Sequence, residues 1–254
     1  MHFITDLDKT IIYSREKEHI CIEKKNEKEI TYITEKSFNL LSNLLKNEKF
    51  SLIPCTLRSY EQMMRVDFIR ENNLKYMICD NGATICIDGK IDEKWDKIID
   101  GIVNKDKVKS LHITMQKFAD ENNIPIYMIK NNRDAFISII FYKKEDAYKY
   151  IDDIITFADD TFTIYKQGKK TYVVPKNLNK DIAVKYLIDT FNICDIVTSG
   201  DSSVDELFVK RGDKIILPSH ATFRIPNSIV TENVGILAGE EIFKILYEDL
   251  NKNK

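Results

Sequence analysis

The sequence lacks the features that mark membrane proteins and nucleic-acid-binding proteins. No hydrophobic run approaches the ~18 residues that a membrane-spanning helix needs. The formal net charge is only −2, so there is no overall basic field to attract a polyanion. Met1-His2-Phe3-Ile4 leads straight into a strand-like run, and we therefore expect no signal peptide. These absences predict a cytoplasmic protein with no nucleic-acid and no membrane partner. We expect a monomer or a homodimer, although none of these absences decides between the two.

The cysteines also lack a pattern. The chain has five, an odd number, and none of them forms a CxxC pair. Reduced, mostly buried thiols are therefore predicted, and zinc binding is not favoured. By contrast, 254 residues with 43% hydrophobic content can build a core with a smaller second domain.

The most informative segment is Asp6-Leu7-Asp8-Lys9-Thr10, which follows the apolar run Phe3-Ile4-Thr5. The chain turns at the end of a strand, so both carboxylates can point into one crevice. In an open α/β sheet that crevice is where ligands bind. Two carboxylates there offer ligands for Mg²⁺, a nucleophile and a general acid/base. The alternative is a capped turn, because Asp and Thr are ordinary turn residues.

Three later segments carry residues of matching chemistry. Ser51 to Thr56 is an apolar run that ends in a hydroxyl residue, and Asn179-Lys180-Asp181 begins an amphipathic helical pattern. Asp195 to Asp205 is a strand-like run that leads into Gly-Asp, with a second Asp four residues later. Together with the first segment, they resemble the four motifs of the haloacid dehalogenase (HAD) superfamily: DxDxT, a strand-end Ser/Thr, a Lys and GDxxxD. The resemblance covers essentially the whole chain.

Shorter segments indicate a branch of that superfamily. Asn81-Gly82-Ala83 resembles the NGA segment of members with a type C2 cap. Thr56 to Gln62, and Asp88-Gly89-Lys90 before Trp95, are similar to the sucrose-phosphate-phosphatase-like, Cof-like branch. The resemblance implies a Mg²⁺-dependent phosphoric monoester hydrolase.

The resemblance also implies roles for individual residues in phosphate-ester cleavage. Asp6 would attack phosphorus and form an aspartyl-phosphate, and Asp8 would protonate the leaving oxygen and later activate water. Thr56, Lys180 and Arg58 would bind the phosphate. For Lys180 the alternative is a solvated lysine in the first turn of a helix.

Mg²⁺ would be held by the Asp6 carboxylate, the backbone carbonyl of Asp8 and Asp201. Asp205, one helical turn after Asp201, would hold a water ligand or bind directly. Gly200 would let the backbone turn sharply beside the metal. The alternative is a helix N-terminus with an acidic first turn, and both interpretations can hold together.

Three positions depart from the family pattern. Lys9 stands where a Gly is frequent, and Val204 replaces the Asn of GDxxND. Leu57 replaces the Gly of TGR, although Arg58 is kept. None of these changes removes a catalytic group, but they argue against copying a substrate from the best-known branches.

The predicted elements along the chain are those of an α/β protein. Alternating runs around a charged turn predict a β-hairpin flap within about residues 14–34. Apolar residues at helical spacing predict helices over 35–47 and 60–72, and a strand follows at 77–79. Helix–strand alternation of this kind is typical of a parallel sheet.

The rhythm changes between residues 85 and 172, where two αββ units on an antiparallel sheet fit best. We therefore predict a HAD-type Rossmann-like parallel-sheet core over 1–84 and 173–254. An α+β C2-type cap is predicted over 85–172. Within it, Lys130, Arg133 and Lys166 offer cations for substrate specificity, or they belong to a solvated Lys-rich face.

The sequence thus favours a Mg²⁺-dependent phosphatase for a small phosphorylated metabolite, such as a sugar phosphate. A phosphomutase with the same aspartyl-phosphate is an alternative within the enzymes. A catalytically silent scaffold with the HAD fold is the alternative outside them. The four motif aspartates argue against the scaffold, because a silent protein has no chemical need for them.

Overall fold

The computed structural model describes residues 1–14 and 16–252, which fold into two compact units. One unit contains Met1–Asp92 and the chain from Lys180 onward, and the other is Glu93–Asn179. Each division lies seven or eight residues beyond the boundary expected from the sequence, because 85–92 pairs with the first unit and 173–175 continues a strand of the second.

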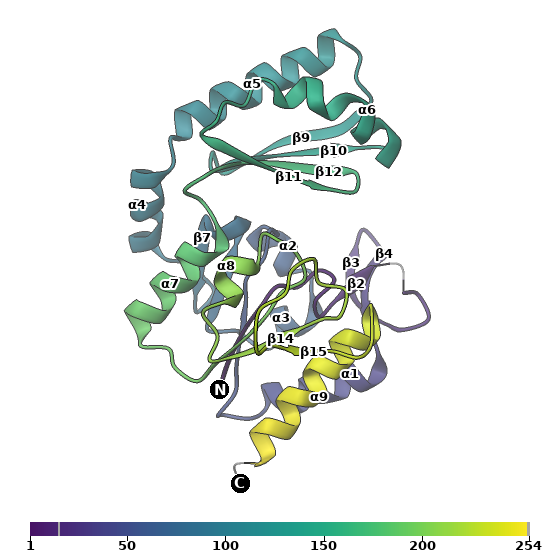
Figure 1. Ribbon diagram of the computed structural model, residues 1–254, viewed down its shortest axis with the longest axis vertical. Helices are drawn as coiled ribbons and strands as arrows, with labels where there is room; N and C mark the ends of the chain where they lie inside the picture. Colours follow the sequence, from purple (N-terminus) through teal and green to yellow (C-terminus); the bar gives the residue numbers. More distant parts are fainter. Residues whose placement is uncertain (15, 253–254) are drawn as a thin grey trace. The chain divides into compact units, whose positions relative to one another are not determined.

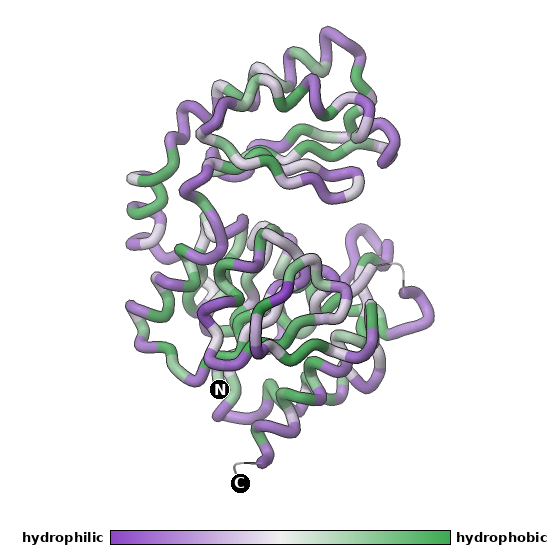
Figure 2. Tube along the Cα trace, in the orientation of Figure 1, coloured by the Kyte–Doolittle hydropathy of each residue, from purple (hydrophilic) through white to green (hydrophobic). Residues whose placement is uncertain are grey.

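The first unit is built on a parallel sheet. Its strands, in spatial order, are β15 (Ile229–Val230), β14 (Lys214–Leu217), β13 (Ile196–Ser199), β1 (His2–Thr5) and β5 (Ser51–Pro54). The three neighbours Phe3, Val197 and Leu52 form one fully buried row across it. Burying such side chains contributes about 1.5–3 kcal/mol each. Figure 2 shows the hydrophobic residues following these strands, as a sheet covered on both faces requires.

Helices cover this sheet (Figure 1). They are α1 (Glu35–Leu45), α7 (Lys180–Phe191), α8 (Glu206–Val209) and α9 (Ile236–Lys252). Helix α1 packs on α9, and α7 packs on α8. The start of α1 is fixed locally, because the Thr34 hydroxyl accepts a hydrogen bond from the Ser37 N–H at 2.9 Å. The α/β class with a parallel sheet is confirmed.

The predicted flap is present as a three-stranded antiparallel sheet. It contains β2 (Tyr13–Ser14), β4 (Lys28–Ile33) and β3 (Ile20–Lys25). Asn26 and Glu27 form the turn between β3 and β4, both with positive φ (48° and 62°), as a tight two-residue hairpin turn requires. The pairing of β3 with β4 shifts register on both sides of Glu23.

The single helix expected over 60–72 is wrong. The structure has two short helices, α2 (Tyr60–Met63) and α3 (Asp67–Glu71), with Val66 extended between them (φ −80°, ψ 119°). Val66 forms an isolated antiparallel bridge with Glu23 of the flap. A tertiary contact therefore interrupts a segment whose apolar spacing alone is helical.

A small antiparallel sheet extends the first unit. It consists of β6 (Tyr76–Cys79), β7 (Thr84–Ile87) and β8 (Lys90–Ile91), with the 3₁₀ turn η1 (Asp80–Gly82) between the first two. Strand β6 lies beside β5 through a Cys55–Ile78 bridge. This pairing explains why 85–92 belongs to the core rather than to the inserted unit.

The inserted unit has the two αββ repeats expected of a cap. Its antiparallel sheet has the order β11 (Phe162–Gln167), β12 (Lys170–Pro175), β10 (Phe136–Phe141) and β9 (Ile126–Asn132). Its helices are α4 (Glu93–Ile102), α5 (Lys105–Glu121) and α6 (Lys144–Ile155). Figure 1 shows α5 and α6 on one face of this sheet.

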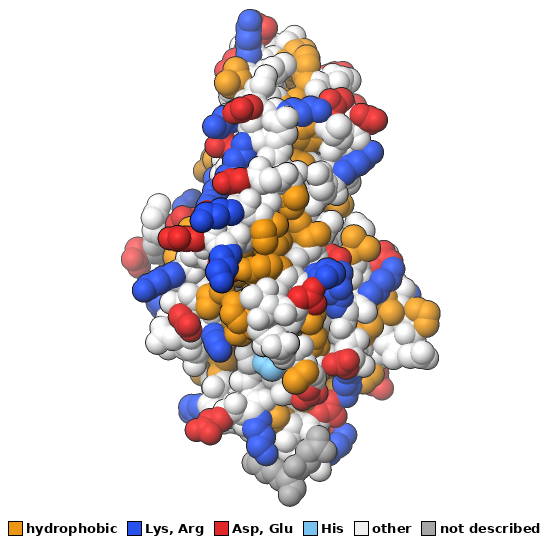
Figure 3. Space-filling view, turned by 90° about the vertical axis from the view of Figure 1, so that its left-hand side faces the viewer, with side chains coloured by type: hydrophobic (Ala, Val, Ile, Leu, Met, Phe, Trp, Pro, Cys, Tyr) orange, Lys and Arg blue, Asp and Glu red, His pale blue; other side chains and the backbone are white. Residues whose placement is uncertain are grey.

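The surface carries mixed charge. On the face drawn in Figure 3, acidic and basic side chains alternate, as expected from 38 Lys and Arg against 40 Asp and Glu. Within the described part of the chain, every helix is too short or too polar to cross a membrane.

Candidate active site

Strand β1 and its two neighbours, β13 and β5, end at one edge of the core sheet. Thr5 at the end of β1 pairs with Ser199 of β13 and with Pro54 of β5. The Asp6 N–H then donates to the Ser199 carbonyl at 3.0 Å. The motif residues that follow these strand ends are Asp6, Thr56 and Asp201. Parallel pairing therefore brings three separate motifs together, at the edge where α/β sheets bind ligands.

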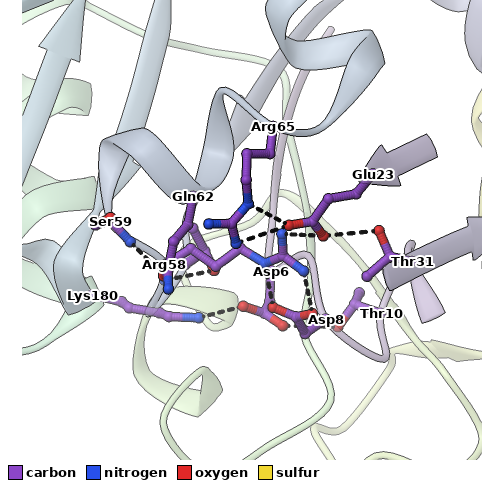
Figure 4. Close-up of polar contacts among 11 residues, drawn as sticks. Asp6, Asp8, Thr10, Glu23, Thr31, Arg58, Ser59, Gln62, Arg65 and Lys180 are labelled. Carbon is purple, nitrogen blue, oxygen red and sulfur yellow. Dashed lines mark hydrogen bonds and ion pairs between the residues drawn. The ribbon is translucent and has the colours of Figure 1, made fainter. Parts of the chain in front are cut away.

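A buried lysine links the first motif to the last. Lys180, the first residue of α7, is completely buried, and its Nζ lies 2.6 Å from Asp6 Oδ1 (Figure 4). The same Nζ lies 2.6 Å from Asp205 Oδ1. A buried ammonium group is tolerated only when it is paired, because desolvation of an isolated charge costs several kcal/mol. Lys180 therefore belongs to the site and is not a solvated surface lysine.

The charges of these groups act strongly on one another. Burial lowers the pKa of Lys180, but Asp205 and Asp6 outweigh it and hold that pKa well above its usual value. Burial raises the pKa of Asp6; Lys180 opposes this shift, and Asp205 and Asp201 add to it. Burial, followed by the charge of Asp205, raises the pKa of Asp201 to about 7. The carboxylates therefore need additional positive charge to be ionised together.

The carboxylates fit a divalent cation. Oxygen atoms of Asp6, Asp201 and Asp205 lie within 4.8 Å of one another, and all three side chains are buried. Such hard oxygen donors are what Mg²⁺ prefers. Burial is the largest cause of the raised pKa values of Asp6 and Asp201, and neighbouring carboxylates add to it, so a bound cation would favour the ionised forms.

Asp205 is more heavily engaged than the other carboxylates. Its Oδ1 accepts from Lys180, and its Oδ2 accepts from the Ser202 N–H at 3.0 Å and the Ser202 hydroxyl at 2.9 Å. These contacts favour the first of the two roles expected for Asp205, in which it holds a water ligand of the metal and does not bind the metal directly. Gly200 is needed here for space, because a Cβ on it would lie 2.5 Å from the Asp205 Cβ. Its φ is not positive, so a sharp turn is not the reason for the glycine.

Arg58 lies against Asp8. Its Nε donates to Asp8 Oδ2 at 2.7 Å and its Nη2 to Asp8 Oδ1 at 2.8 Å, a bidentate pair. Its Nη1 donates to Glu23 Oε2 at 2.8 Å. The sequence assigned Arg58 to phosphate binding, but here its guanidinium contacts two carboxylates. Glu23 and Arg65, which also contacts Glu23, could not be recognised from the sequence, because nothing in their local pattern sets them apart.

Thr56 is buried at the end of the strand β5. Its N–H donates to the Ile78 carbonyl at 3.0 Å, so this amide is already used within the fold. Its hydroxyl accepts from the Arg58 N–H at 3.2 Å and keeps its own proton for donation. Of the two donors that Thr56 carries, the hydroxyl is the one that remains for the phosphate.

The turn of the first motif is contacted by a residue that is distant in the sequence. Lys9 has a positive φ of 64°, which explains why Gly is frequent at this position. His220 lies 2.7 Å from the Lys9 carbonyl through Nε2, and its Nδ1 accepts from the Gly235 N–H at 3.2 Å. Because Nδ1 accepts, Nε2 carries the proton and donates to Lys9. His220 could not be recognised from the sequence, since the contact spans 211 positions and no motif marks it.

The three cations proposed in the inserted unit have different surroundings. Arg133 Nη2 pairs with Asp96 at 3.0 Å, and Lys166 Nζ pairs with Asp152 of α6 at 2.5 Å, which places Lys166 on the helix-covered face. Lys130 pairs in register with Ser138 on β10, on the opposite face. No ion pair of Lys130 is found among the described residues.

Comparison with known proteins identifies the family of this chain. A family model described as sucrose-6F-phosphate phosphohydrolase matches residues 1–223. The search of curated proteins found no match. The sucrose-phosphatase of Synechocystis sp. PCC6803, solved with sucrose and phosphate, is similar in fold, with TM-score 0.63, 14% identity and 98% coverage of both chains.

Two further solved structures have the same fold. A trehalose-6-phosphate phosphatase related protein has TM-score 0.62 and 17% identity, with full coverage of both chains. A HAD subclass IIB sugar phosphatase has TM-score 0.64 and 13% identity, and covers 96% of this chain and 98% of its own. Because these identities are low, the structural likeness shows the fold alone. The class of reaction is shown by the family match. The chain therefore belongs to the sucrose-6F-phosphate phosphohydrolase family and is a HAD-superfamily phosphoric monoester hydrolase.

Proposed function

We propose that the protein is a Mg²⁺-dependent phosphatase that hydrolyses a small sugar phosphate through an aspartyl-phosphate on Asp6. The observation that carries this proposal is the contact between the buried Asp6 carboxylate and Lys180, next to Asp201. A nucleophile beside a fixed cation suits phosphoryl transfer, which is catalysed mainly by positioning and by charge neutralisation.

The proposed reaction has two halves. In the first, an Asp6 oxygen forms a bond to phosphorus as the bond to the sugar oxygen breaks, and Asp8 gives that oxygen a proton. In the second, the Asp8 carboxylate takes a proton from water, which attacks phosphorus. The Asp6–phosphorus bond then breaks, inorganic phosphate leaves, and both side chains return to their starting forms.

The other polar groups stabilise charge during these steps. Lys180 neutralises Asp6 and the phosphoryl group, and the Thr56 hydroxyl donates to a phosphoryl oxygen. Asp6 and Asp201, with the Asp8 carbonyl, would hold Mg²⁺. Bound there, the cation supplies Lewis-acid neutralisation of phosphate charge.

A sugar as the leaving group is supported by the family and by the sheet of the inserted unit. The face that carries Lys130 also carries the partly exposed Tyr165, and the buried Ser138 and Tyr172 lie in the same register row. Hydroxyl, ammonium and aromatic groups suit the hydroxyls and apolar ring faces of a sugar. The Synechocystis relative was solved with sucrose and phosphate, so disaccharide phosphates are the first compounds to test.

A panel of sugar phosphates and other phosphorylated metabolites tests the proposal. The purified protein is incubated with Mg²⁺, released phosphate is measured, and the organic product is identified. Release of inorganic phosphate with free sugar is expected. An isomeric sugar phosphate without phosphate release would identify a phosphomutase instead, and no turnover of any compound would favour a silent scaffold.

A further inference from the structure

We propose that Glu23, a residue of the flap, is a positioning residue for the second half of the reaction. It fixes Arg58, and Arg58 in turn orients the Asp8 carboxylate that accepts a proton from water. This inference rests on the proposed function, because it assumes that Asp8 activates water against a phosphorylated Asp6.

The burial of Glu23 is the first observation. Its side chain is completely inaccessible, whereas the next two residues on the strand, Lys24 and Lys25, are exposed. Desolvation of a carboxylate is costly unless the charge is paired and hydrogen-bonded. A surface hairpin gains nothing in solubility or stability from an acid in such a place unless its partners compensate it.

Each carboxylate oxygen of Glu23 has defined partners. Oε2 accepts from Arg58 Nη1 at 2.8 Å and from the Thr31 hydroxyl at 3.1 Å. Oε1 accepts from Arg65 Nε at 3.0 Å, and Arg65 Nη2 also lies 3.0 Å away. Figure 4 shows Glu23 between the two arginines, with Asp8 on the far side of Arg58. The carboxylate therefore has a fixed orientation.

Arg58 transmits that orientation to Asp8. Its guanidinium is planar and rigid. The hydrogen bond from Nη1 to Glu23 therefore restricts the direction of Nε and Nη2, which donate to Asp8. The Asp8 side chain itself is 48% exposed, whereas that of Arg58 is only 11% exposed. The buried end of the chain of contacts, at Glu23, therefore anchors the exposed end, at Asp8.

The backbone is arranged around the same carboxylate. Strand β3 changes register on both sides of Glu23, and Glu23 bridges to Val66. That bridge lies at the break between α2 and α3. The segment that carries Arg58 and Arg65 lies before the break, and α3 follows it. Both irregularities bring the flap against the segment that carries the two arginines.

This geometry suits one chemical step in particular. The bidentate pair with Arg58 suits the ionised form of Asp8, which is the form left once Asp8 has protonated the leaving oxygen and the form that accepts a proton from water in the second half-reaction. A poorly oriented Asp8 should therefore slow hydrolysis of the aspartyl-phosphate more than its formation from an ester with a good leaving group. A misplacement of about 1 Å can cost on the order of 100-fold in rate.

The test is rapid mixing of the whole protein with p-nitrophenyl phosphate and Mg²⁺, followed by acid quench. Phosphorylated enzyme is measured by intact mass, and p-nitrophenol by absorbance. In Glu23→Gln we expect steady-state turnover to fall by about 10- to 100-fold. The fraction of enzyme that carries phosphate on Asp6 should rise above the wild-type value, because formation of the intermediate is less affected than its hydrolysis.

The matched control is Glu29→Gln, which removes a half-exposed carboxylate from the same hairpin and should leave both readouts unchanged. If Glu23→Gln does not fold, Arg58→Lys replaces it, since lysine cannot grip Asp8 with two parallel bonds. The same accumulation is expected there. If turnover and the phosphorylated fraction fall together, or if neither changes, the positioning role is wrong. If the wild type neither turns over nor becomes phosphorylated, the proposed function itself fails.

Discussion

Lys180 and Asp205 form a completely buried ion pair, with Nζ and Oδ1 separated by 2.6 Å. The pair ties the start of α7 to the loop after β13, and the same ammonium group reaches Asp6. Asp205 therefore acts on the nucleophile through Lys180. Its second oxygen is held by Ser202, so the carboxylate cannot turn away without loss of two hydrogen bonds.

Replacement of this lysine should abolish catalysis. In Lys180→Met, phosphate release should fall at least about 100-fold, since charge on the phosphoryl group is no longer neutralised. The free energy of unfolding should fall by about 3–5 kcal/mol near neutral pH, because Asp6 and Asp205 lose their partner. This penalty should shrink in acid as Asp6, whose pKa is raised chiefly by burial, takes up a proton.

Lys185→Met is the matched control, because Lys185 lies on the same helix in an exposed pair with Asp189. Its effect on stability should stay below about 1 kcal/mol. Turnover assays and denaturant titrations check both variants. Similar losses for the two lysines would contradict the central place of Lys180.

Gly200→Ala should damage the site through Asp205. The added methyl group would lie 2.5 Å from the Asp205 Cβ, so this carboxylate must move and take Lys180 with it. We expect a lower Tm and a loss of turnover of at least about tenfold. Gly101→Ala in helix α4 meets nothing within 4 Å and should be neutral or stabilising. An active Gly200→Ala enzyme with unchanged Tm would rule out the spatial constraint.

The effect of Mg²⁺ on stability should depend on pH. In the metal-free protein the pKa of Asp201 is raised from 3.8 to about 7. A raised pKa in the folded state favours folding below the unfolded pKa, and this contribution is lost as pH rises through about 7. Because Mg²⁺ needs the ionised carboxylate, it should raise Tm little near about pH 5.5 and more near about pH 8.

Thermal melts with and without Mg²⁺ across this range check the linkage. Asp201→Asn should remove most of the difference between the two pH values, as an amide does not titrate. An increase in Tm that is the same at every pH, in both proteins, would show that the cation does not bind through Asp201.

The inserted unit should govern substrate choice through Lys130. In Lys130→Ala the KM for the best sugar phosphate should rise several-fold, whereas turnover of p-nitrophenyl phosphate, which needs few additional contacts, should change little. Lys166→Ala and Arg133→Ala remain informative comparisons, because both cations already have carboxylate partners. Equal effects on both substrates would show that Lys130 is an ordinary surface residue.

The candidate site residues could be proposed from the sequence where the signal lies in a short local motif. Each motif follows a strand-like run or begins a helical pattern, and the resemblance to the HAD superfamily predicted that Asp6, Thr56 and Asp201 belong to one site. In the structure, the parallel pairing of β1 with β13 and β5 brings these strand ends to one edge of the sheet. Flap, parallel sheet and inserted αββ units followed from hydrophobic periodicity.

Features that depend on contacts between distant segments could not be predicted. The break at Val66 depends on its bridge to Glu23, and the support of Lys9 depends on His220. The burial of Glu23 is also invisible in a strand whose following residues are charged and exposed. In each case, tertiary contacts override the local pattern or add to it.

The most direct test of the central claim is to locate the phosphoryl group during turnover. Wild-type protein and Asp6→Asn are mixed with Mg²⁺ and a sugar phosphate labelled in its phosphate, quenched in acid and mapped by peptide mass. We predict label on Asp6 in the wild type, with release of inorganic phosphate. In Asp6→Asn there should be neither label nor turnover, although the fold is retained. Substantial phosphate release by Asp6→Asn, or label on another residue, would contradict nucleophilic catalysis by Asp6.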